Sequence, residues 1–235
     1  MDSLIFILII LIGMAGSYFG KKLTLPGAIT GGILAAVIYF ASGWSGVCMM
    51  TLFFILGTLA TSWKHSLKES LHIAEENKGR RNAQQVFANA GIAGILCLFI
   101  LFYPKYTSAL VLMMAAAFSS ATADTVSSEL GSVYGKKFYN IITGKKDIRG
   151  LNGVISIEGC LWGLAGSIAI GIIYSLFEGW GGRFFIVVLA GTSGNLFDSF
   201  LGATVERTGR LKNNAVNFLN TLFAAMVAGV FILLS

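Results

Sequence analysis

Apolar residues dominate this chain in long runs, which short polar segments separate. Eight runs approach the length of about 20 apolar residues with which a helix crosses the hydrocarbon core of a bilayer. They cover residues 4–20, 26–42, 45–62, 86–103, 107–128, 152–177, 183–205 and 214–234. The pattern predicts an all-α fold, a polytopic bundle of about eight transmembrane helices that forms a single integral membrane domain over residues 1–235.

The composition supports a membrane location. Hydrophobic residues make up 55% of the 235 residues and charged residues only 12%, whereas about a quarter of the residues of a soluble domain are charged. This excludes the ordinary soluble enzymes and binding modules. We expect a multi-pass protein of a prokaryotic cytoplasmic membrane.

The basic residues gather on one side of the predicted bundle. Fifteen of the 17 Lys and Arg residues lie in the loops that follow the first, third, fifth and seventh runs. By the positive-inside rule these loops are cytoplasmic and both termini lie outside. The net charge of +6 therefore belongs mostly to a cytoplasmic face, and no nucleic-acid partner is expected.

Polar side chains recur at helical spacing in the cytoplasmic halves of five predicted helices. Residues three or four apart lie on one face of a helix. The stripes are Arg81, Gln85 and Asn89; Ser120, Asp124 and Ser128; Glu158, about two turns into its helix; Asn195, Asp198 and Ser199, followed by Glu206 and Arg207; and Asn213, Asn217 and Asn220. Interhelical hydrogen bonds explain any single Asn or Ser. The whole set, with its acids, predicts a shared pocket, because intramembrane carboxylates usually mark functional sites.

The available residue types limit the chemistry of this pocket. Residues 1–62 form an apolar scaffold, whereas residues 79–220 carry the polar motifs, and no predicted span contains a histidine. Carboxylates that hold Mg²⁺, with Lys and Arg that bind phosphates, suit phosphoryl transfer. We predict Asp124, Glu129 and Asp198 as metal ligands, with Glu158 as a further catalytic acid.

The linker after Glu129 is a candidate nucleotide-binding segment. It contains glycines together with Lys136 and Lys137, and successive backbone N–H groups in such a segment can bind an anion. A plain turn is the alternative explanation of its glycines.

Five segments resemble a known membrane family. They read G-R-R-N-A-Q-Q-V-F-A-N (79–89), D-T-V-S-S-E-L-G-S-V-Y-G-K-K (124–137), R-G-L-N-G-V-I-S-I-E-G-C-L-W-G-L-A-G-S (149–167), N-L-F-D-S-F-L-G-A-T-V-E-R (195–207) and L-K-N-N-A-V-N-F-L-N (211–220). Together they resemble the family that includes plant phytyl-phosphate kinase. A looser similarity, centred on the S-x-E-G from Ser156 to Gly159, extends to the CTP-dependent phytol and dolichol kinases.

This resemblance implies an activity and a set of residues. The activity is transfer of a phosphate from a nucleoside triphosphate, with CTP favoured, to an isoprenyl monophosphate lipid in the presence of Mg²⁺, which gives a diphosphate. By position the resemblance implicates Arg80, Arg81, Asn89, Asp124, Ser128, Glu129, Glu158, Asp198, Glu206, Asn213 and Asn217. With the stripes and the linker added, the predicted substrate- and nucleotide-binding residues are Arg80, Arg81, Gln85, Asn89, Thr125, Ser128, Lys136, Lys137, Ser156, Asn195, Ser199, Glu206, Arg207, Asn213 and Asn217.

Two other functions use the same residue types. A transporter or channel also places acids along an ion path, although polar residues are few in the outer halves of the predicted spans. A cytidylyltransferase that joins CTP to a lipid phosphate would need the same metal site. The sequence leaves the prenyl chain length, the nucleotide donor and the oligomeric state open.

Overall fold

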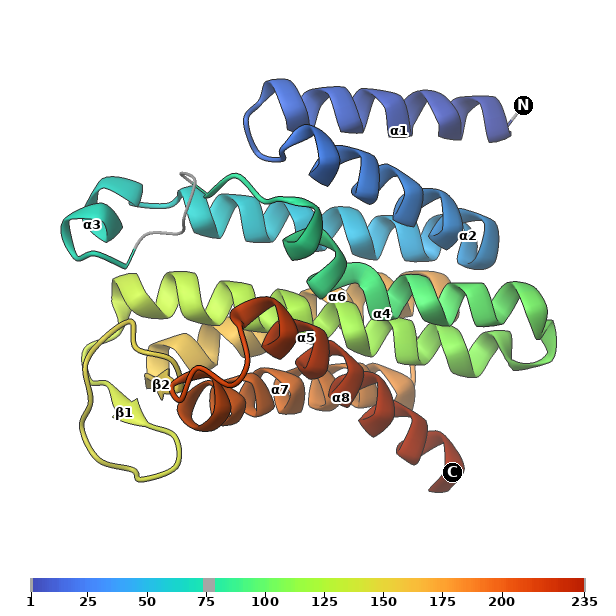
Figure 1. Cartoon of the computed structure of the whole chain (residues 1–235). Coiled ribbons are helices and arrows are strands. Elements are labelled where there is room, and N and C mark those ends of the chain that lie inside the picture. Colours follow the sequence, from blue (N-terminus) through green and yellow to red (C-terminus); the bar gives the residue numbers. More distant parts are fainter. Residues whose placement is uncertain (1, 74–78, 235) are drawn as a thin grey trace.

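The computed structural model describes residues 2–73 and 79–234, a bundle of helices that run roughly along one direction (Figure 1). Lys78, one of the loop cations counted above, lies outside the described residues. The helices are α1 (Asp2–Phe19), α2 (Leu25–Ser62), α3 (His65–Ser70), α4 (Ala83–Phe102), α5 (Thr107–Tyr134), α6 (Ile157–Glu178), α7 (Gly182–Leu201) and α8 (Asn213–Leu234). The predicted polytopic helical bundle is confirmed. The described residues add one small antiparallel pair of strands, β1 (Tyr139–Asn140) and β2 (Val154–Ile155).

Helix α2 folds back on itself at Gly43. A straight helix of its 38 residues would be about 57 Å long, yet Nζ of Lys22, just before it, lies 2.9 Å from Oγ of Ser62 at its end. Gly43 has φ 63° and ψ −147°, a conformation that glycine adopts because it lacks Cβ. The two halves of α2 therefore run antiparallel (Figure 1), in the positions of the predicted spans 26–42 and 45–62.

Six helices of the described chain are long and apolar enough to cross a membrane, with α2 counted once, and residues 4–19 of α1 form a shorter apolar helix. The four basic loops lie at one end of the bundle, while the start of α1 and the end of α8 lie at the other (Figure 1). This arrangement agrees with the charge pattern. The number of eight crossings and the outside location of the termini stay predictions.

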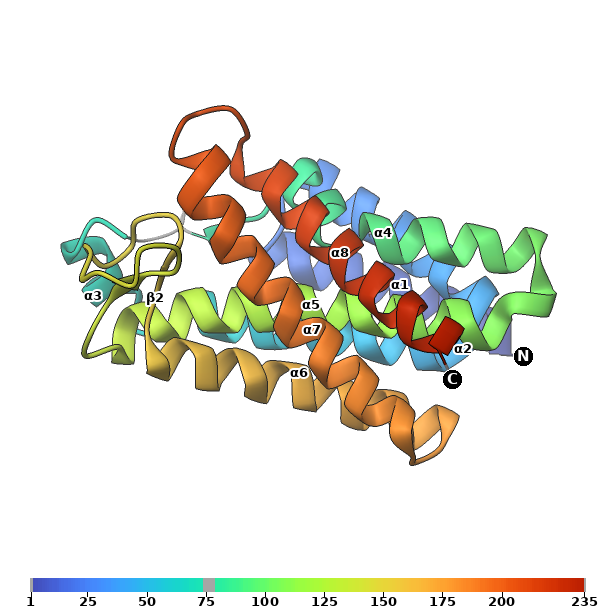
Figure 2. The same ribbon diagram turned by 90° about the horizontal axis from the view of Figure 1, so that it is seen from below.

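Helix α5 occupies the centre of the bundle and contacts α2, α4, α6, α7 and α8 (Figure 2). Its stretch from Met114 to Ala123, M-A-A-A-F-S-S-A-T-A, is fully buried. Small side chains allow helix backbones to approach closely where lipid supplies no hydrophobic drive for association. The neighbours of α5 complement it with glycine: Gly191 of α7 lies against Ser119, and Gly159 of α6 lies against Gly131.

Two predicted helix boundaries were wrong. Helix α5 continues to Tyr134, beyond the predicted end at residue 128. Helix α6 begins at Ile157, where the side chain of Ser156 caps the helix by accepting a hydrogen bond from the Gly159 N–H. The predicted start at residue 152 falls instead in a loop with positive φ at Gly150 and Gly153. Glu158 consequently lies in the first turn of its helix and not two turns inside it.

A connection between distant loops joins the apolar scaffold to the rest of the bundle. The N–H of Arg81 donates to the carbonyl of Lys22, and the N–H of Thr24 donates back to the carbonyl of Arg81. The guanidinium of Arg80 donates to the carbonyl of Leu23 at 2.8 Å. The segment before α4 is thus held by the turn between α1 and α2.

We expect Gly131→Ala to destabilise the bundle by about 1–3 kcal/mol, the usual cost of overpacking a close contact. A Cβ at this position would lie 2.7 Å from Cα of Gly159. The thermal unfolding midpoint in detergent measures the effect. Gly16→Ala in α1 is the control, because a Cβ there meets no atom within 4 Å; equal midpoints for the two variants would contradict the proposed packing.

Candidate functional site

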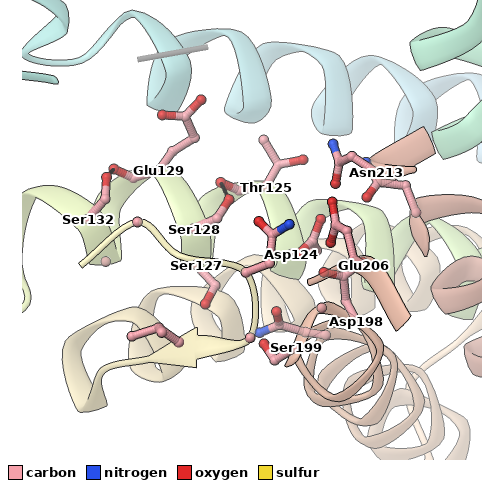
Figure 3. Close-up of a pocket in the computed structure, with 18 of the residues that line it drawn as sticks. Asp124, Thr125, Ser127, Ser128, Glu129, Ser132, Asp198, Ser199, Glu206 and Asn213 are labelled. Atoms are coloured by element: carbon pink, nitrogen blue, oxygen red, sulfur yellow. Dashed lines mark hydrogen bonds between the residues drawn. The ribbon is translucent and has the colours of Figure 1, made fainter. Parts of the chain in front are cut away.

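The ends of α4 to α8 enclose a polar cavity of about 770 Å³ at the basic end of the bundle (Figure 3). Each of these helices contributes side chains to it, as the polar stripes predicted. The predicted site residues that line it are Arg81, Gln85, Asn89, Asp124, Thr125, Ser128, Glu129, Ser156, Asn195, Asp198, Ser199, Glu206, Asn213 and Asn217. The stripes therefore converge.

Three carboxyl groups meet in the middle of this cavity. Asp124 comes from α5, Asp198 from α7, and Glu206 from the π-helical turn Gly202–Glu206 that follows α7 (Figure 3). The carboxyl groups of Asp124 and Asp198 lie within hydrogen-bonding reach of each other, and Glu206 lies beside them in the cavity (Figure 3). Oδ1 of Asp198 also accepts a hydrogen bond of 2.6 Å from the amide of Asn220. Carboxylates this close repel each other unless a proton or a bound cation lies between them.

A fourth carboxylate, Glu129, is held by a lysine from the loop after α2. Lys68 is 1% exposed, and its ammonium donates to Oε2 of Glu129 at 2.5 Å and to the carbonyls of Ala60 and Thr61. Oε1 of Glu129 is buried and has no hydrogen-bond partner among the described residues; the same holds for Oδ1 of Asn89. Both residues line the cavity. Buried polar atoms are rarely left without a partner, so these two oxygens are available to accept hydrogen bonds or to hold a cation in the cavity.

Three helices begin at the cavity. Asn82, the N-cap of α4, Ser156, the N-cap of α6, and Asn213, the first residue of α8, all line it. A helix N-terminus carries a partial positive charge and N–H groups without intrahelical partners, which favours anions. One side of the cavity thus suits phosphate groups, while the neighbouring carboxyl groups of Asp124 and Asp198 suit a cation.

The residue types that line the cavity suit a magnesium ion. Once Glu129 is paired with Lys68, the cavity retains Asp124, Asp198 and Glu206 against the cations Arg81 and Lys212. Mg²⁺ prefers one or two carboxylates together with water and phosphate oxygens. In the described part of the chain, no three His, Cys, Asp or Glu side chains form a group that could hold a metal by themselves. Asp124 and Asp198 would hold the ion with help from the substrate phosphates.

Five predicted residues lie outside the cavity: Arg80, Lys136, Lys137, Glu158 and Arg207. Arg80 stacks on the ring of Tyr18 at 5.2 Å and bonds the carbonyl of Leu23. Lys136 and Lys137 are exposed in the loop just after the end of α5 at Tyr134. Glu158 accepts a hydrogen bond of 3.4 Å from the N–H of Lys136.

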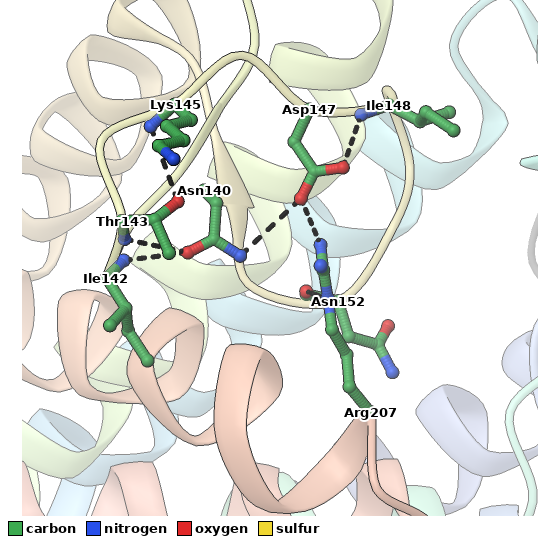
Figure 4. A network of polar contacts seen from close by, with 8 residues as sticks. All are labelled: Asn140, Ile142, Thr143, Lys145, Asp147, Ile148, Asn152 and Arg207. Carbon is green, nitrogen blue, oxygen red and sulfur yellow. Dashed lines mark hydrogen bonds and ion pairs between the residues drawn. The ribbon is translucent and has the colours of Figure 1, made fainter.

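Arg207 instead fastens the hairpin that contains β1 and β2 (Figure 4). Its guanidinium donates to Oδ2 of Asp147 at 2.8 Å and to the carbonyl of Asn152 at 2.6 Å. Residues 150–156, at the end of this hairpin, line the cavity. Gly153 packs directly against Ala203 in the turn after α7, where a Cβ would clash at 2.3 Å. The hairpin therefore forms one wall of the cavity, and Arg207 fixes that wall.

Comparison with known sequences identifies the family. The profile of the family described as integral membrane protein DUF92 matches residues 7–225. The chain belongs to this family. A DUF92 relative, an uncharacterised membrane protein of Synechocystis, is 34% identical over 88% of this chain and 82% of its own length. An uncharacterised membrane protein of Methanocaldococcus jannaschii is 31% identical over 86% of this chain and 82% of its own length.

Two plant proteins also match this DUF92 chain. The chloroplastic protein VTE6 of Arabidopsis thaliana is 32% identical over 89% of this chain and 66% of the VTE6 sequence. The protein PGR of Arabidopsis thaliana is 28% identical over 92% of both chains. The resemblance to the plant membrane family, which the motifs after Gly79 suggested, is thereby confirmed. No solved structure matches the chain.

The sequence motifs missed Lys68 and Lys212. Lys68 stands in a charged loop segment with exposed neighbours such as Ser66 and Glu69. Its only distinguishing signal is its position about two turns after the end of an apolar run. Lys212 directly precedes α8 and is the only cation that the loop after α7 adds to the cavity.

We expect the wall formed by the hairpin to loosen in acid. The hydrogen bond from Arg207, followed by that from the Ile148 N–H, lowers the pKa of Asp147. A depressed pKa means that the contact stabilises the protein above the ordinary Asp value of about 3.9 and is lost as the pH falls through the lower, folded-state value. Hydrogen exchange of residues 139–155, corrected for intrinsic rates, should stay constant between about pH 7 and 5 and rise below about pH 4.

Arg207→Gln provides the matched variant, since it should raise exchange in this segment already at neutral pH. Arg183→Gln, in the first turn of α7 at the opposite end of the bundle, should not, because that guanidinium bonds Ser108. A hairpin that exchanges identically in the wild type and in Arg207→Gln would refute the fastening role.

Lys68→Met should destabilise the protein by about 3–5 kcal/mol, because removing one partner leaves the other charge buried without compensation. Adding Glu129→Gln to this variant should restore part of the loss, since it removes the uncompensated charge. The free energy of unfolding in mixed micelles measures both effects, and Lys64→Met, at an exposed lysine of the same loop, is the control. Equal stabilities of Lys68→Met and Lys64→Met would contradict the buried ion pair.

Proposed function

We propose that this protein phosphorylates an isoprenyl monophosphate to the diphosphate, with a nucleoside triphosphate as the donor and Mg²⁺ as the cofactor. The observation that carries the proposal is the polar cavity at the basic end of a membrane bundle, where Asp124, Asp198 and Glu206 face three helix N-termini. Such a cavity offers a cation site and anion sites at the same membrane depth. Both are needed when two phosphates must be brought together.

Different residues of the chain would bind the metal ion and the phosphates. Asp124 and Asp198 would hold the metal ion, which neutralises phosphate charge when it is bound. The N-termini of α4, α6 and α8, with Arg81 and Lys212, would bind phosphate oxygens through N–H groups and charge. The backbone of residues 150–156 lines the cavity and would contact a bound nucleotide. Holding two phosphates in line removes much of the entropic barrier to reaction.

The reaction needs little acid–base help from the protein. An oxygen of the prenyl monophosphate attacks the γ-phosphorus of the nucleotide, the bond from that phosphorus to the bridging oxygen breaks, and the nucleoside diphosphate leaves. A phosphate monoester has a second pKa of about 6 and is mostly a dianion at neutral pH. None of the described residues that line the cavity is a histidine, which agrees with this chemistry.

Relatives support the substrate class. The motifs between residues 79 and 220 resemble the family of plant phytyl-phosphate kinase, and the chain matches the chloroplastic protein VTE6 over most of its own length. The resemblance to the CTP-dependent lipid kinases favours CTP as the donor. An isoprenoid lipid would keep its tail in the bilayer while its phosphate reached the cavity.

Asp124→Asn and Asp198→Asn should each lower the Mg²⁺-dependent phosphorylation of geranylgeranyl monophosphate by at least about a hundredfold, a loss typical of removing one group that stabilises transition-state charge. The assay uses purified protein in nanodiscs, with each nucleoside triphosphate tested in turn. Glu178→Gln, at an exposed acid of the opposite end, is the control and should retain full activity.

The products separate this function from its competitors. A prenyl diphosphate with a nucleoside diphosphate supports the kinase. A CDP-lipid with pyrophosphate would establish a cytidylyltransferase in its place. Full kinase activity in both aspartate variants would remove the proposed roles of these residues.

A further inference from the structure

A second hollow lies on the lipid-facing side of the bundle, across α5 from the polar cavity. This apolar groove has a volume of about 340 Å³ and lies between the second half of α2, α5 and α6. It is lined by Leu56, Ala60 and Trp63 of α2, by Leu130 and Tyr134 of α5, and by Trp162 of α6, among others. The groove therefore begins at the basic end, near Trp63 and Tyr134, and extends for about two helical turns toward the middle of the bundle.

Adjacent faces of α5 separate the groove from the polar cavity. Val126 and Leu130 line the groove, whereas Thr125, Ser128 and Glu129 line the cavity. On the α6 side this wall is closed, because Gly131 and Gly159 bring the two backbones into direct contact. On the α2 side a side chain fills the space between the helices. Lys68 bonds Ala60, which lines the groove, and Glu129, which lines the cavity.

Two cations stand at this boundary. Besides Lys68, the guanidinium of Arg81 lies against α2, where a Cβ on Gly57 would come within 2.7 Å of it, and 5.5 Å from the ring of Phe53. Arg81 also lines the polar cavity. The apolar groove thus lies next to two positive charges, just as the apolar tail of a lipid phosphate lies next to its charged headgroup.

The rim of the groove suits a lipid headgroup. The indole N–H of Trp63 donates to the hydroxyl of Tyr134 at 2.8 Å, and the ammonium of Lys64 lies 5.0 Å from the Tyr134 ring. Trp and Tyr favour the boundary between hydrocarbon and headgroups. The groove consequently opens to lipid at the level where the phosphate of a membrane lipid lies.

We propose that this groove binds the isoprenoid chain of the lipid phosphate substrate, whose headgroup turns inward between α2 and α5 toward Lys68 and Arg81. The inference rests on the proposed function. It adds a binding site for the isoprenoid chain and a route by which the lipid phosphate reaches the cavity. The lipid enters from the side of the bundle, while the nucleotide reaches the cavity from the water-filled end. The buried ammonium of Lys68 exchanges part of its contact with Glu129 for the incoming phosphate.

Photo-crosslinking tests the tail site without requiring turnover. The probe is geranylgeranyl monophosphate with a diazirine at the far end of its chain, added to the full chain in nanodiscs, and mass spectrometry maps the adducts. Adducts are expected at the inner end of the groove, on Leu56, Val126 and Ala169, and unlabelled geranylgeranyl monophosphate should displace them. The corresponding alcohol should label the groove more weakly, because it lacks the charge that Lys68 and Arg81 attract.

Ala165→Phe fills the groove from a side chain that is exposed to lipid. We expect the groove adducts to fall about tenfold, the effect of excluding roughly two methylene equivalents of buried chain. Leu161→Phe, at an exposed α6 position that does not line the groove, is the matched control and should label like the wild type. In the phosphorylation assay Ala165→Phe should raise KM for the twenty-carbon substrate and leave KM for dimethylallyl monophosphate unchanged.

The outcomes separate the two proposals. Adducts spread evenly over the lipid-facing helices, or groove adducts that persist in Ala165→Phe, overturn the tail site even if phosphate transfer is observed. Groove adducts with no phosphate transfer from any nucleotide would keep the lipid site and overturn the kinase.

Discussion

The structure depends on the close packing of five helices around α5. One helix can have so many neighbours only if its side chains are small over the region of contact, as they are from Ala115 to Ala123, apart from Phe118. Within a bilayer this packing must be dense, because lipid tails compete for the same apolar surfaces. Glycines on the neighbouring helices, such as Gly191 and Gly194 against Ser119 and Ser120, bring the backbones nearer still.

The same packing produces the polar cavity. Toward the basic end, α5 changes from alanine and serine to Asp124, Thr125 and Ser128, while α7 and α8 keep their places beside it. Side chains on these helices that would otherwise face lipid are held facing one another. Their charges are compensated locally, by Lys68 at Glu129 and by Asn220 at Asp198. A carboxylate that remains after such compensation is costly to keep in a membrane unless it binds something.

How well the sequence predicted each residue depended on whether regular helix geometry placed it. Asp124, Asp198, Asn89 and Asn217 lie on helices, and helical spacing alone was enough to bring them to one face. Arg207, Lys136 and Lys137 lie in or beside loops, where charge counts cannot tell a cavity residue from an exposed one or from a fastening contact. The burial of Lys68 could not be predicted from the sequence either, for a different reason. Its short helix α3 returns to the membrane surface, and the burial of its ammonium depends on tertiary contacts with α2 and α5 that no local pattern encodes.

The backbone hydrogen bonds that join Lys22 and Thr24 to Arg81 give the first sixty residues a role that their apolar composition does not indicate. Because the backbone of the α1–α2 turn fixes Arg81 on both sides, the position of a charged group in the cavity is set by a part of the chain that contributes no side chain of its own there. The N-terminal hairpins are therefore not an interchangeable membrane anchor. Grafting them from an unrelated membrane protein would preserve insertion into the bilayer and still displace the arginine.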